Sequence, residues 1–332
     1  MPASLGRVIA LSLLLGMMSI GGHAADRPLV LERTIPLDGV EGRIDHMAVD
    51  LARKRLFVAE FGNDTVDAVD LDTGKVAHRL AGLDEPQGLA YLPGSDLLVV
   101  ANGGDGSVRM FHGEDLAPAG SIALGDDADN VRVDPNTGRV LVGYGDGALA
   151  ILDPVSRARI ADVQLAAHPE SFQLDPQAGR VFVNLPDARQ IAVIDLASRR
   201  QVASWKVPGL RSNFPMGLDE QATALTVVYR DPSQLVLINP KTGAVIQGVE
   251  TCGDADDVFF DAKRQQAYVS CGSGVVDVVR KDAAGLHPID RIETSSGART
   301  SLFVPELDRL FVAARAGWLG SKASILVFRP VS

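Results

Sequence analysis

The sequence predicts an all-β protein, a seven-bladed β-propeller of four-stranded antiparallel blades that is closed by its N-terminal strand. Three observations lead to this prediction. A two-strand pattern recurs seven times along the chain, no repeat contains a long helical period, and the chain ends one strand short of a complete seventh repeat. Short strands repeated at a fixed spacing are typical of propellers.

The repeat is defined by two columns of aligned residues. The first column ends an apolar run and contains Asp50, Leu92, Asp134, Asp175, Asp219, Asp261 and Val304, with steps of 42, 42, 41, 44, 42 and 43 residues. Eight residues after this anchor every repeat has a valine: Val58, Val100, Val142, Val183, Val227, Val269 and Val312. A unit of roughly 40 to 45 residues with four strands is a propeller blade.

Each repeat divides into short strands joined by turn-forming residues. The inner strand ends at the anchor, and the second strand carries the valine. TVDAVDL (residues 65–71) is an example of a third strand, and KVAHRL (residues 75–80) of a fourth. Turn sequences such as Asp72-Thr73-Gly74 separate them. We expect the blades to begin near residues 44, 86, 128, 169, 213, 255 and 298.

The seventh repeat lacks a fourth strand, because the chain ends directly after its third. An unassigned strand, LVLERTIPL (residues 29–37), precedes the first repeat. We expect it to complete the last blade and so to cover sheet edges that an open array would expose. Residues 25–332 then form one propeller domain.

Residues 1–24 have the composition of a secretory signal peptide. A basic start, MPASLGR, is followed by the apolar run VIALSLLLGMMSI and then by small residues up to Ala24. We expect cleavage after Ala24, with Ala25 as the alternative. The apolar run is too short to span a bilayer, so no membrane span is expected after cleavage. The predicted location is periplasmic or secreted.

The net charge bears on the kinds of partner that we expect, and the cysteine content bears on a disulfide. The formal net charge is −10, and binding to a phosphate backbone depends on Lys and Arg, so no nucleic acid partner is expected. Cys252 and Cys271 are the only cysteines. In an oxidising compartment they are expected to form a disulfide, since antiparallel pairing brings the two positions together.

The segment LFVAEFGNDTVDAVDLDTGKVAHRL (residues 56–80) resembles the blades of the YVTN-repeat propellers, the YncE-like family of exported bacterial proteins. VVANGGDGSVRMF (residues 99–111) and VFVNLPDARQIAVIDL (residues 181–196) repeat it less closely. The resemblance covers nearly all of the mature chain and implies a propeller scaffold. Such scaffolds carry both binding proteins and enzymes.

Polar residues gather where the chain enters the inner strands, at the predicted mouth of the central channel. Two acidic stretches stand out, GDDADNVRV (residues 125–133) and CGDADDVFF (residues 252–260). The candidate ligand-binding residues are Asp45, His46, Asp129, Asn130, Glu170, Asp256, Asp257, Arg299 and, from the longer loop of the seventh repeat, Trp318. The alternative is that Asp and Asn only satisfy backbone N–H groups at the strand entrances.

Part of this set could hold a divalent cation. The candidate ligands are His46, Asn130, His168, Glu170 and Asp257, because hard cations prefer oxygen and imidazoles favour transition metals. Neither acidic stretch fits the calcium-loop motif. His46 is also a candidate for proton transfer, or else a hydrogen-bonded strand residue. Arg299 either binds a substrate carboxylate or neutralises the acidic ring.

Two functions are compatible with these features. The first is a binding or scaffold protein whose polar, acidic channel mouth holds a small ligand, a metal ion or a protein partner. The alternative is a metal-assisted hydrolase or lactonase with its site at the same mouth. The chain has no recognised catalytic signature, which favours the binding function.

Overall fold

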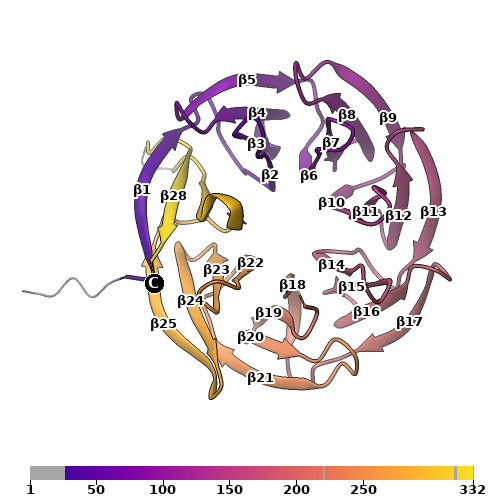
Figure 1. Ribbon diagram of the computed structural model, residues 1–332, viewed down its shortest axis with the longest axis vertical. Coiled ribbons are helices and arrows are strands. Elements are labelled where there is room, and N and C mark those ends of the chain that lie inside the picture. Colours follow the sequence, from indigo (N-terminus) through magenta and orange to yellow (C-terminus); the bar gives the residue numbers. More distant parts are fainter. Residues whose placement is uncertain (1–26, 220, 318–319, 332) are drawn as a thin grey trace, which may run out of the picture.

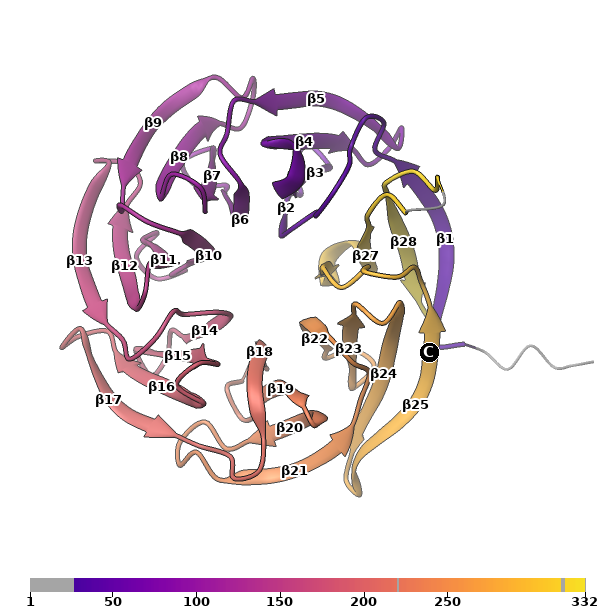
Figure 2. The same cartoon turned by 180° about the vertical axis from the view of Figure 1, so that it is seen from behind.

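The computed structural model describes residues 27–219, 221–317 and 320–331, and shows a closed ring of seven four-stranded antiparallel sheets (Figures 1 and 2). The predicted fold class is confirmed. The signal peptide with its cleavage alternatives and Trp318 lie outside the described residues. Among the residues that are described, no helix has the length and apolar character needed to cross a membrane.

The strands of each blade follow the chain from the channel outwards, and Figure 1 shows the innermost strands around the centre of the ring. The innermost strands are β2 (Met47–Asp50), β6 (Pro86–Leu92), β10 (Ala128–Val133), β14 (Phe172–Asp175), β18 (Arg211–Leu218), β22 (Ala255–Asp261) and β26 (Ser301–Val304). The second strands are β3 (Arg55–Glu60), β7 (Leu97–Asn102), β11 (Val140–Tyr144), β15 (Arg180–Leu185), β19 (Leu225–Asp231), β23 (Gln266–Cys271) and β27 (Arg309–Ala314).

The remaining strands complete the blades. The third strands are β4 (Thr65–Asp70), β8 (Ser107–His112), β12 (Ala148–Asp153), β16 (Gln190–Asp195), β20 (Ser233–Ile238), β24 (Val275–Asp282) and β28 (Ser324–Pro330). The outer strands are β5 (Lys75–Ala81), β9 (Pro118–Ala123), β13 (Ala158–Gln164), β17 (Arg200–Trp205), β21 (Val245–Glu250), β25 (Gly285–Glu293) and β1 (Leu29–Pro36). Two short 3₁₀ helices, η1 (Phe61–Asn63) and η2 (Pro305–Leu307), lie in connections.

The two columns that define the repeat have separate structural roles. The seven repeat valines, one on each second strand, are fully buried and lie in hydrophobic clusters that join neighbouring blades. The anchor aspartates instead shape the turn that follows the inner strand. The carboxylate of Asp50, for example, accepts hydrogen bonds from the backbone N–H groups of Ala52 and Arg53, at 3.0 and 3.2 Å. Such side-chain turns favour Asp.

The ring closes between the two ends of the chain, as the sequence predicts. β1 pairs antiparallel with β28, from Leu29 opposite Pro330 to Pro36 opposite Ser324, and Figure 1 shows the indigo β1 beside the yellow β28. Ile35 packs from β1 into the core with 1% of its surface exposed. Arg309 of β27 also forms an ion pair with Glu32 of β1. The outer strand of the last blade is therefore held by packing, backbone pairing and charge.

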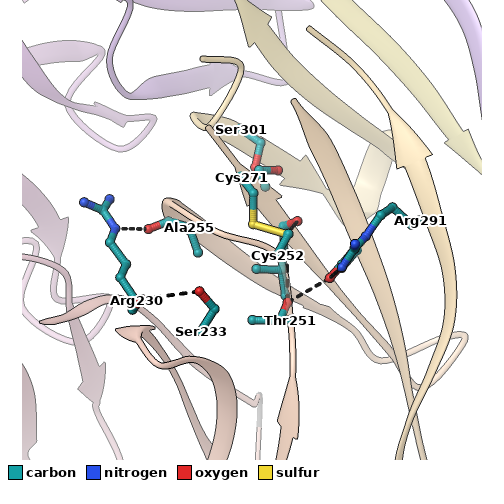
Figure 3. The surroundings of a disulfide bond; sticks show 11 residues. Arg230, Ser233, Thr251, Cys252, Ala255, Cys271, Arg291 and Ser301 are labelled. Atoms are coloured by element: carbon teal, nitrogen blue, oxygen red, sulfur yellow. Dashed lines mark hydrogen bonds and ion pairs between the residues drawn. A yellow bond between two sulfur atoms is a disulfide. The ribbon is translucent and has the colours of Figure 1, made fainter. Parts of the chain in front are cut away.

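The predicted disulfide between Cys252 and Cys271 is present, with the two Cα atoms 6.0 Å apart (Figure 3). Cys271 ends β23 and is opposite Ala255, the first residue of β22, and Cys252 lies in the loop just before β22, so the bond joins this loop to the end of β23. It fixes the segment that contains the second acidic stretch.

Truncation of Ile35 should weaken the closure far more than truncation of Leu31 on the same strand. Ile35→Ala should lower the free energy of unfolding by about 2–4 kcal/mol, because it leaves a cavity in the core. Leu31 is 50% exposed, so Leu31→Ala should change it by less than about 0.5 kcal/mol. Urea denaturation measures both. Equal losses would show that β1 does not pack as the structure describes.

Removal of the disulfide should destabilise the protein without changing its fold. The bonded cysteines are 19 residues apart, and in the chain-entropy model a loop of this size gives about 3 kcal/mol. The double variant Cys252→Ala, Cys271→Ala should show this loss in urea denaturation. The same loss should appear in wild-type protein held under reducing conditions. An unchanged denaturation midpoint in both would contradict a role in stability.

Candidate functional site

The similarity of the two acidic stretches arises from a turn that precedes the inner strand. Seven residues before the anchor, Glu85, Asp127, Ser212 and Asp254 all have left-handed backbone conformations, with φ of 50°, 30°, 60° and 58°. Asp adopts this conformation more readily than most residues. The carbonyl groups of Asp127 and Asp254 accept hydrogen bonds from Gly145 and Gly272, at 3.1 and 2.8 Å. These two aspartates therefore have a shared structural reason to be present.

The next residues of these loops form a charged surface around one end of the channel. We call it the channel mouth, and it consists of residues 43–46, 127–130, 168–170, 254–257, Arg230 and Arg299. Among the predicted site residues it brings together, Asp45, Asp129, Asn130 and Asp257 are buried, whereas His46, Glu170 and Asp256 are partly buried.

Two arginines bind the acidic residues of the sixth blade. Arg230 lies 2.5 Å from a carboxylate oxygen of Asp256, and its Nε donates a hydrogen bond to the carbonyl of Ala255, beside the disulfide (Figure 3). Arg299 forms ion pairs of 3.1 Å with both Asp254 and Asp256. These contacts favour the neutralising role considered for Arg299. Gly272 permits the arrangement, because a Cβ atom there would lie 2.0 Å from the carboxylate of Asp254.

The first blade contributes a second charged group. Arg43 lies 2.5 Å from Asp45, and the Nε2 atom of His46 lies 3.7 Å from the same carboxylate. Burial raises the pKa of Asp45; His46 and Arg43 oppose this rise, and Asp129 and Asp256 add to it. Because these last two residues belong to the third and sixth blades, their carboxylates act on Asp45 from other parts of the ring.

His168 connects the third and fourth blades. Its Nδ1 atom lies 2.7 Å from the carbonyl oxygen of Gly145, and its Nε2 atom lies 3.8 Å from Asp129. Burial alone would lower the pKa of His168, but Asp129 and the carbonyl of Gly145 outweigh it and raise the pKa to about 9. The contacts with Asp129 and Gly145 therefore favour the protonated imidazole.

Glu170 and Asp257 titrate near neutral pH. Burial raises the pKa of Glu170 to about 7, with help from Asp129 and Asp256. Burial also raises the pKa of Asp257 to about 7, although His46 and Arg132 favour its ionised form. One oxygen of Asp257 accepts a hydrogen bond of 2.7 Å from the backbone N–H of Ser301. That bond matches the structural alternative considered for the acidic residues.

In the part of the chain that the structure describes, no three His, Cys, Asp or Glu side chains are placed to hold one metal ion. Asn130 is 3% exposed, and its Oδ1 atom has no hydrogen-bond partner. The cation site of His46, Asn130, His168, Glu170 and Asp257 stays a prediction, as does proton transfer by His46. The ion pairs described at the mouth join arginines to carboxylates.

The central channel opens below the mouth as a cavity of about 460 Å³ lined by residues of all seven inner strands or their ends. Its charged lining residues are His46, Arg132 and Asp257. Sequence reasoning missed Arg132 and Arg43 as site residues. Arg43 stands two residues before Asp45, and Arg132 stands two residues before the anchor Asp134. A search for charged residues on the inner strands would have found Arg132.

Replacing Asp257 should flatten part of the dependence of stability on pH. The unfolded chain releases this proton near the ordinary aspartate pKa of about 3.9, whereas the folded protein holds it until a pH of about 7. Stability should therefore fall as the pH rises from the first value to the second, by about 4 kcal/mol. Asp257→Asn removes this fall and retains an acceptor for Ser301. The exposed Asp187 provides the control Asp187→Asn. Urea denaturation at several pH values from 4 to 8 measures the free energy of unfolding of each protein. The same decrease with pH in Asp257→Asn and in wild type would contradict this prediction.

No protein-family model matches the chain, and no curated protein matches its sequence. Many solved structures are similar to it, including the following two. Hydrazine synthase from Kuenenia stuttgartiensis has a TM-score of 0.75 at 16% identity, over 87% of this chain and 98% of that one. A chain of the mitotic checkpoint complex has a TM-score of 0.79 at 16% identity, over 98% of this chain and 99% of that one. These similarities support the seven-bladed β-propeller fold, and the resemblance to YVTN-repeat propellers stays a prediction.

Proposed function

We propose that the protein is an exported binding protein that takes up a small polar ligand through the channel mouth. The observation that carries this proposal is the set of opposite charges at the channel mouth, next to a channel cavity of about 460 Å³ that His46 and Asp257 of the mouth also line. Arg43, Arg230 and Arg299 alternate there with carboxylates from several blades. Cavities of roughly 300–1,000 Å³ with a few placed polar groups are typical of small-molecule sites.

The charge balance of the mouth favours a polar organic ligand. The two acidic residues Asp254 and Asp256 each contact arginine, which leaves fewer free carboxylates for a cation. A ligand with its own charged groups can exchange partners with these ion pairs, because guanidinium groups bind carboxylates in a fixed planar geometry. No observation in the described residues favours the metal-assisted hydrolase.

The cysteine pair supports an exported location. Disulfides form and persist in oxidising compartments such as the periplasm, and Cys252 and Cys271 are bonded. An exported propeller with a charged mouth is suited to binding a solute outside the cytoplasm. We place the protein in the periplasm or in the secreted fraction on this ground together with the signal-like N-terminal sequence.

A thermal-shift screen tests the proposal. Small organic acids, amines and zwitterions are each added to the purified protein, with divalent cations and a chelator in parallel. A ligand at a hundredfold excess over its Kd stabilises the folded state by about 2.7 kcal/mol. At least one organic ligand should therefore raise the melting temperature measurably.

Two arginine variants locate the binding. Arg299→Gln removes ion pairs at the mouth, whereas Arg291→Gln removes an ion pair with Asp277 in the outer part of the sixth blade, away from the mouth. The shift should fall in Arg299→Gln, at the entrance to the seventh blade, and persist in Arg291→Gln, on the outer strand of the sixth. A response to divalent cations alone, reversed by the chelator, would contradict the proposal and favour the hydrolase.

A further inference from the structure

We propose that the channel cavity binds a zwitterionic amino acid with a bulky apolar side chain, with its carboxylate at Arg132 and its ammonium group at Asp257. This inference rests on the proposed function and names the ligand class. It follows from three features of the cavity: an arginine without an ion pair, an acidic residue near it but not in contact, and an apolar wall.

Arg132 is a half-buried cation that the described protein leaves without a charged partner. Its Nη1 atom donates a hydrogen bond of 2.8 Å to the carbonyl of the adjacent Val131, and its guanidinium carbon lies 5.7 Å from the ring centre of Phe172. Burial lowers the pKa of Arg132, and the nearby carboxylates of Asp257 and Asp129 offset only part of this decrease. Buried charges in proteins are normally paired, so a guanidinium without an ionic partner is unusual. A ligand carboxylate could supply this partner through two parallel hydrogen bonds.

Asp257 provides the opposite charge elsewhere in the cavity. It lines the same cavity as Arg132, and the two side chains influence each other's pKa without forming an ion pair in the described structure. One carboxylate oxygen of Asp257 accepts a hydrogen bond from the backbone N–H of Ser301, and the other oxygen can accept a hydrogen bond from a ligand. An ammonium group there would stabilise the ionised carboxylate, as an opposite charge does at short range.

Much of the remaining wall is apolar, although His46, Gln173 and Ser301 also line the cavity. Val49, Val133, Leu218, Phe259 and Leu302 line the cavity and are each partly exposed. They come from five different blades, so the apolar surface surrounds the channel. Burial of an aliphatic or aromatic side chain against it is favourable by about 25 cal/mol per Å² of apolar area. This requirement separates a bulky apolar amino acid from a small one such as glycine.

A simple monocarboxylate fits this cavity less well. If a monocarboxylate bound at Arg132, its negative charge would lie near the carboxylates of Asp257 and Asp129, which both raise the pKa of that guanidinium. Like charges at short range disfavour each other. A primary amine alone would leave Arg132 without a partner. A zwitterion satisfies both groups at once.

Calorimetric titration with L-phenylalanine tests the inference, with 3-phenylpropanoate, phenethylamine and glycine as comparison ligands. L-phenylalanine should bind wild-type protein more tightly than the other three. Arg132→Gln and Asp257→Asn should each weaken it by roughly ten- to a hundredfold, the loss of one charged hydrogen-bonded contact. Arg132→Lys keeps the charge and should give an intermediate loss. Thermal melts of each variant report on folding, and Arg291→Gln serves as the control and should bind like wild type.

The outcomes separate this inference from the proposed function. Equal binding of 3-phenylpropanoate that is insensitive to Asp257→Asn would overturn the zwitterion and indicate an anion site. If an organic ligand found in the screen depends on Arg299 but not on Arg132, the mouth binds ligands and the channel inference is wrong. If no organic ligand binds the wild-type protein, both proposals fail.

Discussion

The pairing of β1 with β28 is the interaction on which the rest of the structure depends. It joins the two ends of a chain whose other blades are each formed from one continuous segment. The first and last blades also meet at the mouth, where the hydroxyl of Thr300 donates a hydrogen bond of 3.3 Å to the carbonyl of Ile44. Arg43 and Asp45 flank this contact in the chain. Without closure, the charged residues of the first blade would not face those of the third and sixth.

Closure of the ring also explains why several carboxyl groups at the mouth have shifted pKa values. Seven loops converge on a narrow opening, so carboxylates from different blades share one poorly solvated region, and burial raises the pKa of Asp45, Glu170 and Asp257. Crowded acidic groups cost stability unless cations offset them. Arginines supply that compensation at Asp45 and Asp256. The pairing is incomplete in the channel, and perturbed titratable groups in a cavity are typical of functional sites.

The sequence predicts the scaffold well because its determinants are periodic. The buried valines, the anchor aspartates and the strand at residues 29–37 all have defined places in a repeat, and each place has a physical role. The disulfide follows from the same register. The site is less predictable, because ion pairs such as Arg230 with Asp256 join residues 26 positions apart through loops whose geometry the repeat does not determine. The shared left-handed turn at Asp127 and Asp254 is visible only in the backbone.

Arg132 and Asp257 line one channel as opposite charges that do not pair with each other, and the proposed ligand is what joins them. A crystal structure of the protein grown with L-phenylalanine tests this most directly. Ligand density is expected in the cavity, with the carboxylate against the guanidinium of Arg132, the ammonium group against Asp257 and the ring against the apolar wall. A structure in which Arg132 and Asp257 contact each other directly, with no ligand between them, would contradict it.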